Sequence, residues 1–244
     1  MKKLLLITML IICLSLTVTV FAKTDNEILF REIPWGSSYS EVEQLLPDFD
    51  WYPMSFEYMR HYPVCEVLTD STSGFDDDFT YGGINITAQP FSNKETEVAG
   101  YTTSDIELYF AFTSVNGVEN QDYNDTAFYG ARYSFEPANL QGMTDDLTEK
   151  LSSLYGEPDD TKKDTDLWGN KTTIIYWYGA NDTVVTLRSV NSENDSTGLY
   201  NDELFIAYAW EKGDELLKDI DNKMKESAST GESANFGNGN TNGL

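Results

Sequence analysis

The chain has 244 residues, of which 41 are acidic and 16 are basic, and its formal net charge at pH 7 is −25. This charge excludes a protein that binds nucleic acid or anionic membrane surfaces, because contacts with phosphate require clustered lysine and arginine. With only two cysteines, a small scaffold held by several disulfides is also excluded, so the hydrophobic core must hold the fold.

The first 22 residues have the pattern of a secretory signal peptide. Two lysines follow the initial methionine, an apolar stretch comes next, and "VFA" offers a small-x-small cleavage site after Ala22. A transmembrane anchor is the alternative, since the stretch is long enough to span a bilayer. The cleavage site and the polar "KTDNE" after it favour removal, so we expect residues 1–22 to be cleaved. The mature protein would then be secreted, or periplasmic in a Gram-negative source, with no remaining membrane attachment.

After the signal peptide, "FREIPWGSSYSEVEQLLP" predicts a helix and no ligand site. Ser38 followed by Glu41 is a capping box, and Pro47 ends the helix. A phosphate cradle would need more glycine amides and nearby positive charge. The apolar face of this helix is expected to consist of Tyr39, Val42, Leu45 and Leu46.

Two further helices and a tail are predicted in the second half of the chain. "MTDDLTEKLSSLYGEP" predicts a helix that ends at Gly156, with two aspartates in its first turn. Its apolar stripe is Met143, Leu147, Leu151, Leu154 and Tyr155. Another helix is expected over 214–225. Residues 226–244, rich in glycine, asparagine and serine, are expected to form a disordered tail.

The remaining segments alternate apolar and polar residues in the way that is typical of strands with one buried face. The clearest are "IELYFAF", "AFYGARYSF", "ELFIAYAW" and the hairpin "TTIIYWYGANDTVVTLRSV". "GINITA" and residues 64–68 are weaker candidates. A doubly wound parallel fold would need a helix between each pair of strands. We therefore predict an α+β fold, an antiparallel sheet with helices packed on one face.

The order of these elements suggests two half-repeats, 28–117 and 126–212, within a globular region 23–225. Each half would begin with a strand, at 29–33 and at 128–135, and continue with a helix, a proline stop and antiparallel strands. The similarity lies in element order, with little residue identity between the halves.

The chain resembles known families in three of its segments and in its layout. "FREIPWGSSYSEVEQLLP" resembles the first segment of many small exported bacterial proteins with no assigned activity. "LTEKLSSLYGEP" and "LWGNKTTIIYWYGANDTVVTL" are similar to segments of uncharacterised secreted proteins of Gram-positive gut bacteria. The two-half layout is similar in topology to the β-lactamase-inhibitor-protein architecture and to small outer-membrane assembly lipoproteins. That resemblance implies a fold that works by binding proteins, although the paired cysteines and the lipid anchor of those relatives are missing here.

The sequence offers few groups for catalysis or metal binding. His61, the one histidine, lies four residues before Cys65, too far along an extended segment to form a catalytic pair. We therefore expect a non-catalytic protein without a cofactor. A calcium site is a speculative prediction for the three adjacent carboxylates Asp76, Asp77 and Asp78, although "DTDLWGN" fails the EF-hand pattern.

Aromatic residues make up 14% of the chain, above ordinary usage. In the predicted hairpin, Tyr176 and Tyr178 share one face and Trp177 lies on the other. Such rings serve as core or as contacts for proteins and sugars. We predict a secreted acidic binding module with Tyr176, Trp177 and Tyr178 as contacts for a protein or glycan at the cell exterior. The alternative is a carboxylate-dependent extracellular hydrolase acting on carbohydrate, which would need two acids across a cleft.

Overall fold

The computed structural model describes residues 26–53, 83–90, 96–166, 169–192 and 202–229. In these residues one antiparallel sheet dominates, with strand order β1-β2-β5-β6-β10-β9-β8-β7. Its strands are β1 (Phe49–Pro53), β2 (Gly83–Pro90), β5 (Asp105–Phe112), β6 (Thr126–Phe135), β7 (Asp160–Thr165), β8 (Lys171–Tyr178), β9 (Thr183–Asn191) and β10 (Glu203–Trp210). A separate hairpin joins β3 (Glu97–Val98) to β4 (Tyr101–Thr102). The helices are α2 (Tyr39–Leu45), α4 (Val115–Asn120), α5 (Leu140–Tyr155) and α6 (Lys212–Ser229). The predicted α+β class with an antiparallel sheet is confirmed.

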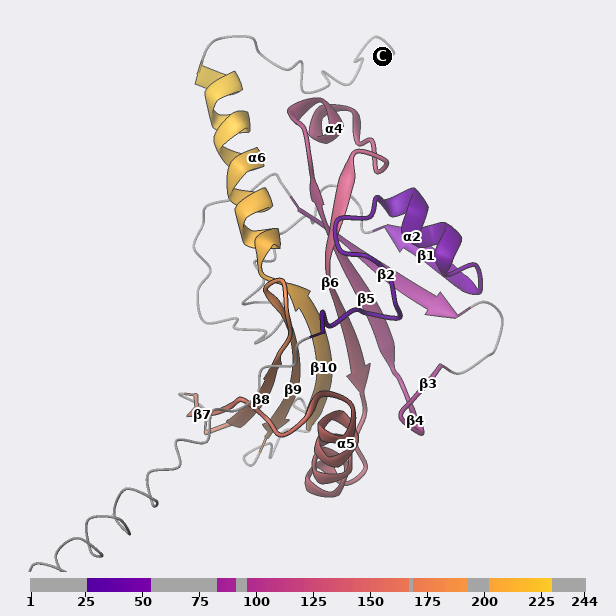
Figure 1. Cartoon of the computed structure of the whole chain (residues 1–244), viewed down its shortest axis with the longest axis vertical. Coiled ribbons are helices and arrows are strands. Elements are labelled where there is room, and N and C mark those ends of the chain that lie inside the picture. Colours follow the sequence, from indigo (N-terminus) through magenta and orange to yellow (C-terminus); the bar gives the residue numbers. More distant parts are fainter. Residues whose placement is uncertain (1–25, 54–82, 91–95, 167–168, 193–201, 230–244) are drawn as a thin grey trace, which may run out of the picture.

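The helices are divided between the two faces of the sheet. On the first face, Val42 of α2 and Leu147 of α5 belong to the larger hydrophobic cluster. On the second face, Leu217 of α6 packs in a smaller cluster with Tyr109 and Tyr129, while Ile220 and Met224, farther along the same helix, belong to the larger cluster. Figure 1 shows α2 and α5 against different parts of the sheet and α6 apart from both. The expectation that helices pack on one face therefore holds for α2 and α5. Helix α6 departs from it because β5 and β6 carry large apolar side chains on both faces, and both must be covered.

Local signals correctly located the start of α2. The Ser38 backbone N–H donates to Glu41 Oε2 at 2.8 Å, and the Ser38 side chain accepts from the Glu41 N–H, so the capping box is present. Leu45 and Leu154, expected in apolar stripes, are instead 54% and 70% exposed. Each lies in the last turn of its helix, α2 or α5.

The ends of the other two helices differ from the predicted ones. Helix α5 begins at Leu140, because Asn139 Oδ1 accepts from the Gly142 N–H at 3.1 Å and caps it. Asp145 and Asp146 therefore lie beyond the first turn. Helix α6 continues to Ser229. Residues 226–229, expected in the disordered tail, are helical, and 230–244 lie outside the described residues.

The segment 29–33 is a turn, so the strand predicted there is wrong. The Ile33 N–H donates to the Phe30 carbonyl at 2.9 Å, and Arg31 and Glu32 have φ of 48° and 63°. Two consecutive positive φ values reverse the chain, which a strand cannot accommodate.

Apart from this missing strand, the two predicted half-repeats agree in the order of their elements. Helix α2 precedes β1, β2 and β5, and helix α5 precedes β7 to β10, each set running from an edge of the sheet to its centre. The duplication itself stays a prediction.

Residues 26–38, here called the N-terminal strap, connect the β8–β9 hairpin to β6. The Ala180 N–H donates to the Asn26 carbonyl at 3.0 Å, and the Ile28 N–H donates to Thr183 Oγ1 at 2.9 Å. At its other end, Trp35 stacks on Phe128 with ring centroids 5.0 Å apart. The strap thus contacts the β8–β9 hairpin and β6, all within the second half, 126–212, and Trp35 packs against β6.

Candidate functional site

The β8 contacts predicted for a partner are mostly buried. Trp177 is fully buried in the first-face cluster, and its indole Nε1–H donates to the Gly156 carbonyl at 3.0 Å. A side chain without exposed surface cannot contact a partner, so the prediction is wrong for Trp177. Sequence alternation correctly separated it from its two tyrosine neighbours and could not tell which face was open.

The two tyrosines pack on the second face under a lysine. Their ring centroids lie 5.9 Å apart at an interplanar angle of 15°, and Lys162 Nζ lies 4.8 Å from the Tyr176 ring centroid. Tyr176 is 4% exposed and Tyr178 is half-buried. Burial raises the pKa of both phenols. A contact role for Tyr176 and Tyr178 stays a prediction, with little surface to support it.

The predicted calcium ligands Asp76, Asp77 and Asp78 lie outside the described residues, as do His61 and Cys65. Across the part of the chain that the structure describes, no three His, Cys, Asp or Glu side chains come close enough together to hold a metal ion. The structure therefore does not test the calcium prediction.

A charged cluster on the second face was not foreseen from the sequence. Arg132 of β6 forms an ion pair with Glu107 of β5, and these side chains are 17% and 13% exposed. The guanidinium groups of Arg132 and Arg188 lie 4.9 and 5.5 Å from the centroid of the Phe205 ring. These residues come from four strands, so only the sheet order brings them together. Because Arg132 and Glu107 are mostly buried, this cluster offers little surface to a partner.

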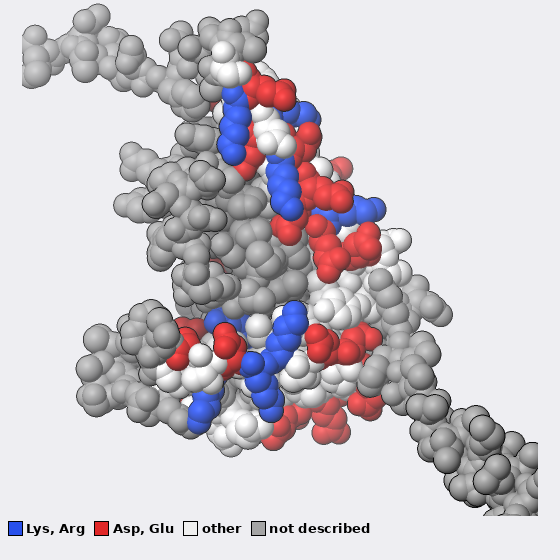
Figure 2. Space-filling model, turned by 90° about the vertical axis from the view of Figure 1, so that its left-hand side faces the viewer, with Lys and Arg blue, Asp and Glu red and all other residues white. Residues whose placement is uncertain are grey.

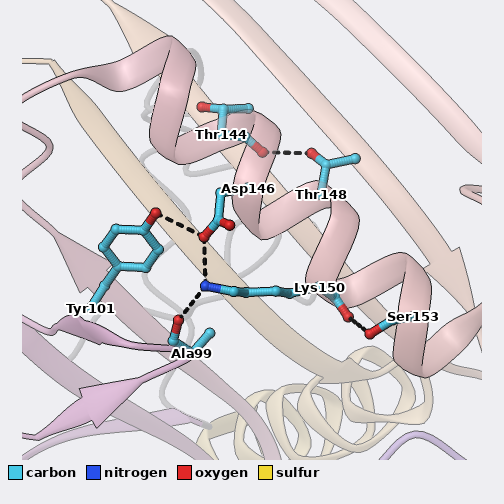
Figure 3. A network of polar contacts seen from close by, with 7 residues as sticks. All are labelled: Ala99, Tyr101, Thr144, Asp146, Thr148, Lys150 and Ser153. Atoms are coloured by element: carbon cyan, nitrogen blue, oxygen red, sulfur yellow. Dashed lines mark hydrogen bonds and ion pairs between the residues drawn. The ribbon is translucent and has the colours of Figure 1, made fainter.

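The β3–β4 hairpin is held against α5 by a small polar network (Figure 3). Tyr101 Oη donates to Asp146 Oδ2 at 2.8 Å. Lys150 Nζ donates to the same oxygen at 2.6 Å and to the Ala99 carbonyl at 2.7 Å. Next to this network lies a hollow of about 420 Å³ lined by Tyr101, Thr102, Glu136, Ala138, Asn139, Gly142 and Met143. Glu136 is the single carboxylate of that lining.

We expect Asp146→Asn to loosen this hairpin without unfolding the sheet. The Lys150 and Tyr101 hydrogen bonds lower the pKa of Asp146 below its ordinary value of 3.8. The stabilising contribution is therefore complete above that ordinary value and is lost as pH falls through the lowered pKa. Hydrogen exchange at Ala99 and Gly100 should be faster in the variant at neutral pH, and the difference should vanish in strong acid. Asp145→Asn, which makes the same change at an exposed carboxylate of this helix that accepts from Gln141, is the matched control. Equal exchange rates in Asp146→Asn and the parent protein at neutral pH would contradict the assignment.

Five side chains form a continuous row on the surface beside α2, here called the aromatic row: Arg31, Tyr39, Phe49, Trp51 and Tyr123. The Arg31 guanidinium lies 5.0 Å from the Phe49 ring centroid, and the Phe49 and Trp51 centroids are 6.5 Å apart. Tyr39 then contacts Trp51 and Tyr123 at centroid distances of 5.7 and 5.8 Å. Arg31 is exposed and the four rings are half-buried. The side chains of the row come from the strap, α2, β1 and the loop after α4.

Buried contacts beneath the row hold two of its rings in place. Thr126, only 4% exposed, accepts from the Tyr39 N–H at 3.1 Å through Oγ1. The same hydroxyl donates to the Tyr123 carbonyl at 2.6 Å. Thr126 thus links the start of α2 to the loop that carries Tyr123. A row held in this way loses little conformational entropy when something binds to it.

The surroundings of the row are acidic. Tyr39 Oη donates to Glu43 Oε1 at 3.3 Å, and burial followed by the Glu43 charge raises the pKa of Tyr39 to about 12. Residues 26–53 include six acidic residues and one basic residue, Arg31. On the side of the molecule where α6 lies, Lys and Arg side chains instead alternate with Asp and Glu (Figure 2). The negative charge near the row is therefore less balanced than on that side.

Comparisons of the chain with known protein families, curated proteins and solved structures found no match. Among the described residues, no helix is both long and apolar enough to cross a membrane. The geometry of the chain itself must therefore support any functional proposal.

Proposed function

We propose that this protein is an exported, non-catalytic module that binds another protein through the aromatic row. The observation that carries the proposal is the row itself, a continuous surface of Arg, Tyr, Phe and Trp side chains beside α2. Tyr, Trp and Arg are the residues most enriched among those that dominate protein–protein binding energy. Half-buried rings combine exposed apolar area with a fixed orientation, which reduces the entropy lost on binding.

The ring geometry favours a protein partner over a glycan. Tyr39 and Trp51 meet edge to face at an interplanar angle of 82°, and Tyr39 and Tyr123 are tilted by 57°. A sugar ring stacks on a flat, open aromatic face, and rings that meet at such angles present no common flat surface. Interlocking rings with Arg31 beside them suit the irregular surface of a protein.

The hydrolase alternative requires two carboxylates that converge across a cleft. The hollow beside α5 has one, Glu136, on its lining. No other described arrangement favours this alternative over a binding module.

The proposal is tested by capture of a partner from the culture fluid and the cell surface of the producing organism. Mature protein, a Trp51→Ala/Tyr123→Ala variant and a Tyr176→Ala/Tyr178→Ala variant are immobilised in parallel. Each captured protein is then purified and its affinity for all three forms is measured. We expect the row variant to lose at least about tenfold in affinity, the scale of one strong contact residue, and the hairpin variant to retain it.

Far-ultraviolet circular dichroism of both variants establishes that they are folded before binding is compared. Loss of affinity in the hairpin variant with retention in the row variant would transfer the contact surface to β8. Capture of a glycan in place of a protein, or turnover of a captured molecule, would overturn the proposal.

A further inference from the structure

We infer that the aromatic row receives arginine side chains of a basic segment in its partner, an inference that rests on the proposed function and adds the chemistry of that partner. Three features of the described residues support it: a guanidinium already seated on one end of the row, an excess of acidic groups around it, and partly exposed rings at its other end.

Arg31 shows how a guanidinium lies on this surface. Its Cζ is 5.0 Å from the Phe49 ring centroid and 5.7 Å from that of Tyr133. Its Nε donates to Tyr133 Oη at 2.7 Å. A planar guanidinium stacks flat on one ring while its N–H groups reach an oxygen on another, whereas an ammonium group lies over a ring only as a compact point charge and gains no flat stacking contact. The same combination of ring and oxygen recurs farther along the row.

At the other end, Tyr39, Trp51 and Tyr123 supply the rings and Glu43 supplies the oxygen. Glu43 is exposed and contacts Tyr39 Oη at 3.3 Å, so its carboxylate lies at the edge of the ring cluster. Residues 114–125, the described segment that carries Tyr123, contain three acidic and no basic residues. A partner arginine would find there a face to stack on and a carboxylate to pair with.

Charge decides between a basic partner and a neutral or acidic one. The chain carries a net charge of −25, and Asp48 and Asp122, which directly precede Phe49 and Tyr123, are both exposed. An acidic segment would be repelled from this surface, whereas a basic segment would be attracted to it and bound more rapidly. Because the attraction includes exposed charges, affinity should fall as salt rises.

The test uses three synthetic peptides of equal length: alternating arginine and glycine, alternating lysine and glycine, and alternating glutamate and glycine. Affinities of the mature protein are measured by calorimetry. The Trp51 indole N–H signal is followed by nuclear magnetic resonance, after assignment with Trp51→Phe. We expect the arginine peptide to bind at least about fivefold more tightly than the lysine peptide, since stacking is added to charge, and the glutamate peptide not to bind.

Two single variants separate a defined site from general attraction by net charge. Glu43→Gln should lower the affinity for the arginine peptide by about five- to tenfold, as loss of one charge-assisted contact would. Glu149→Gln, which removes the same charge from α5, should change the affinity for the arginine peptide less than twofold. Equal losses in both variants, equal affinity for the lysine peptide, or an unmoved Trp51 signal would each overturn the inference.

If a partner captured through the row lacks basic segments while these peptides fail to bind, the proposed function stands and the arginine assignment fails. If no partner depends on the row, both fail.

Discussion

Trp177→Ala should lower the free energy of unfolding by about 3–5 kcal/mol, the usual loss when a large buried ring is truncated. Trp177 is 0% exposed, belongs to the first-face cluster and donates its indole N–H to the Gly156 carbonyl. Truncation would leave a cavity between the sheet and the end of α5 and would remove the partner of that carbonyl. Urea denaturation followed by circular dichroism measures the loss.

Two further variants test the cause of that loss. Trp177→Phe keeps most of the ring and removes the hydrogen bond, so it should lose about 1–3 kcal/mol. Leu154→Ala, at a side chain that is 70% exposed, should stay within about 0.5 kcal/mol of the parent protein. A Trp177→Ala protein as stable as Leu154→Ala would show that the ring lies on the surface and would restore its predicted role as a contact.

Gly179→Ala should destabilise the protein by about 2–3 kcal/mol through overpacking. A Cβ atom at this position would lie 2.5 Å from Thr183 Oγ1, 2.7 Å from Ile28 Cγ1 and 3.0 Å from the Asn26 carbonyl oxygen. The methyl group would therefore push the N-terminal strap away from the β8–β9 hairpin. Thermal unfolding should show a lower midpoint, and hydrogen exchange at the Ile28 amide should accelerate more than exchange in β6.

The matched control for Gly179→Ala lies in the same hairpin. Asp182 has φ of 59°, a conformation that glycine adopts without strain, so Asp182→Gly should be neutral or slightly stabilising. If Gly179→Ala were also neutral, the close approach of the strap to this hairpin would be wrong.

Local sequence patterns predicted those features whose cause lies within a few residues. The capping box of Ser38 and Glu41 concerns neighbouring side chains, and it correctly started α2. The turn between β8 and β9 was located by "GANDTV", and Asn181 and Asp182 do adopt the positive φ values that such a hairpin requires. Turn geometry does not reveal the second constraint on Gly179, the close approach of Asn26 and Ile28 from the strap.

The candidate site could not be predicted in the same way. The rings of the aromatic row come from segments up to 84 residues apart in the chain, from Tyr39 to Tyr123. In the strand pattern Trp177 looked as available as Tyr178, since alternation separates two faces and does not say which one another layer covers. Only after α2, β1 and the loop following α4 pack together do Tyr39, Trp51 and Tyr123 share one surface.

The sequence by itself determined the secondary structure class, the main antiparallel strands, the cap of α2, the β8–β9 turn and the acidic character of the chain. These depend on periodicity, on contacts between near neighbours and on composition. The tertiary structure alone decided that β5 and β6 are buried on both faces, that α6 covers the second face, that Trp177 is core, and that a row of half-buried rings remains at the surface. Those outcomes depend on which distant segments exclude water from each other, and burial of that kind is a property of the assembled layers.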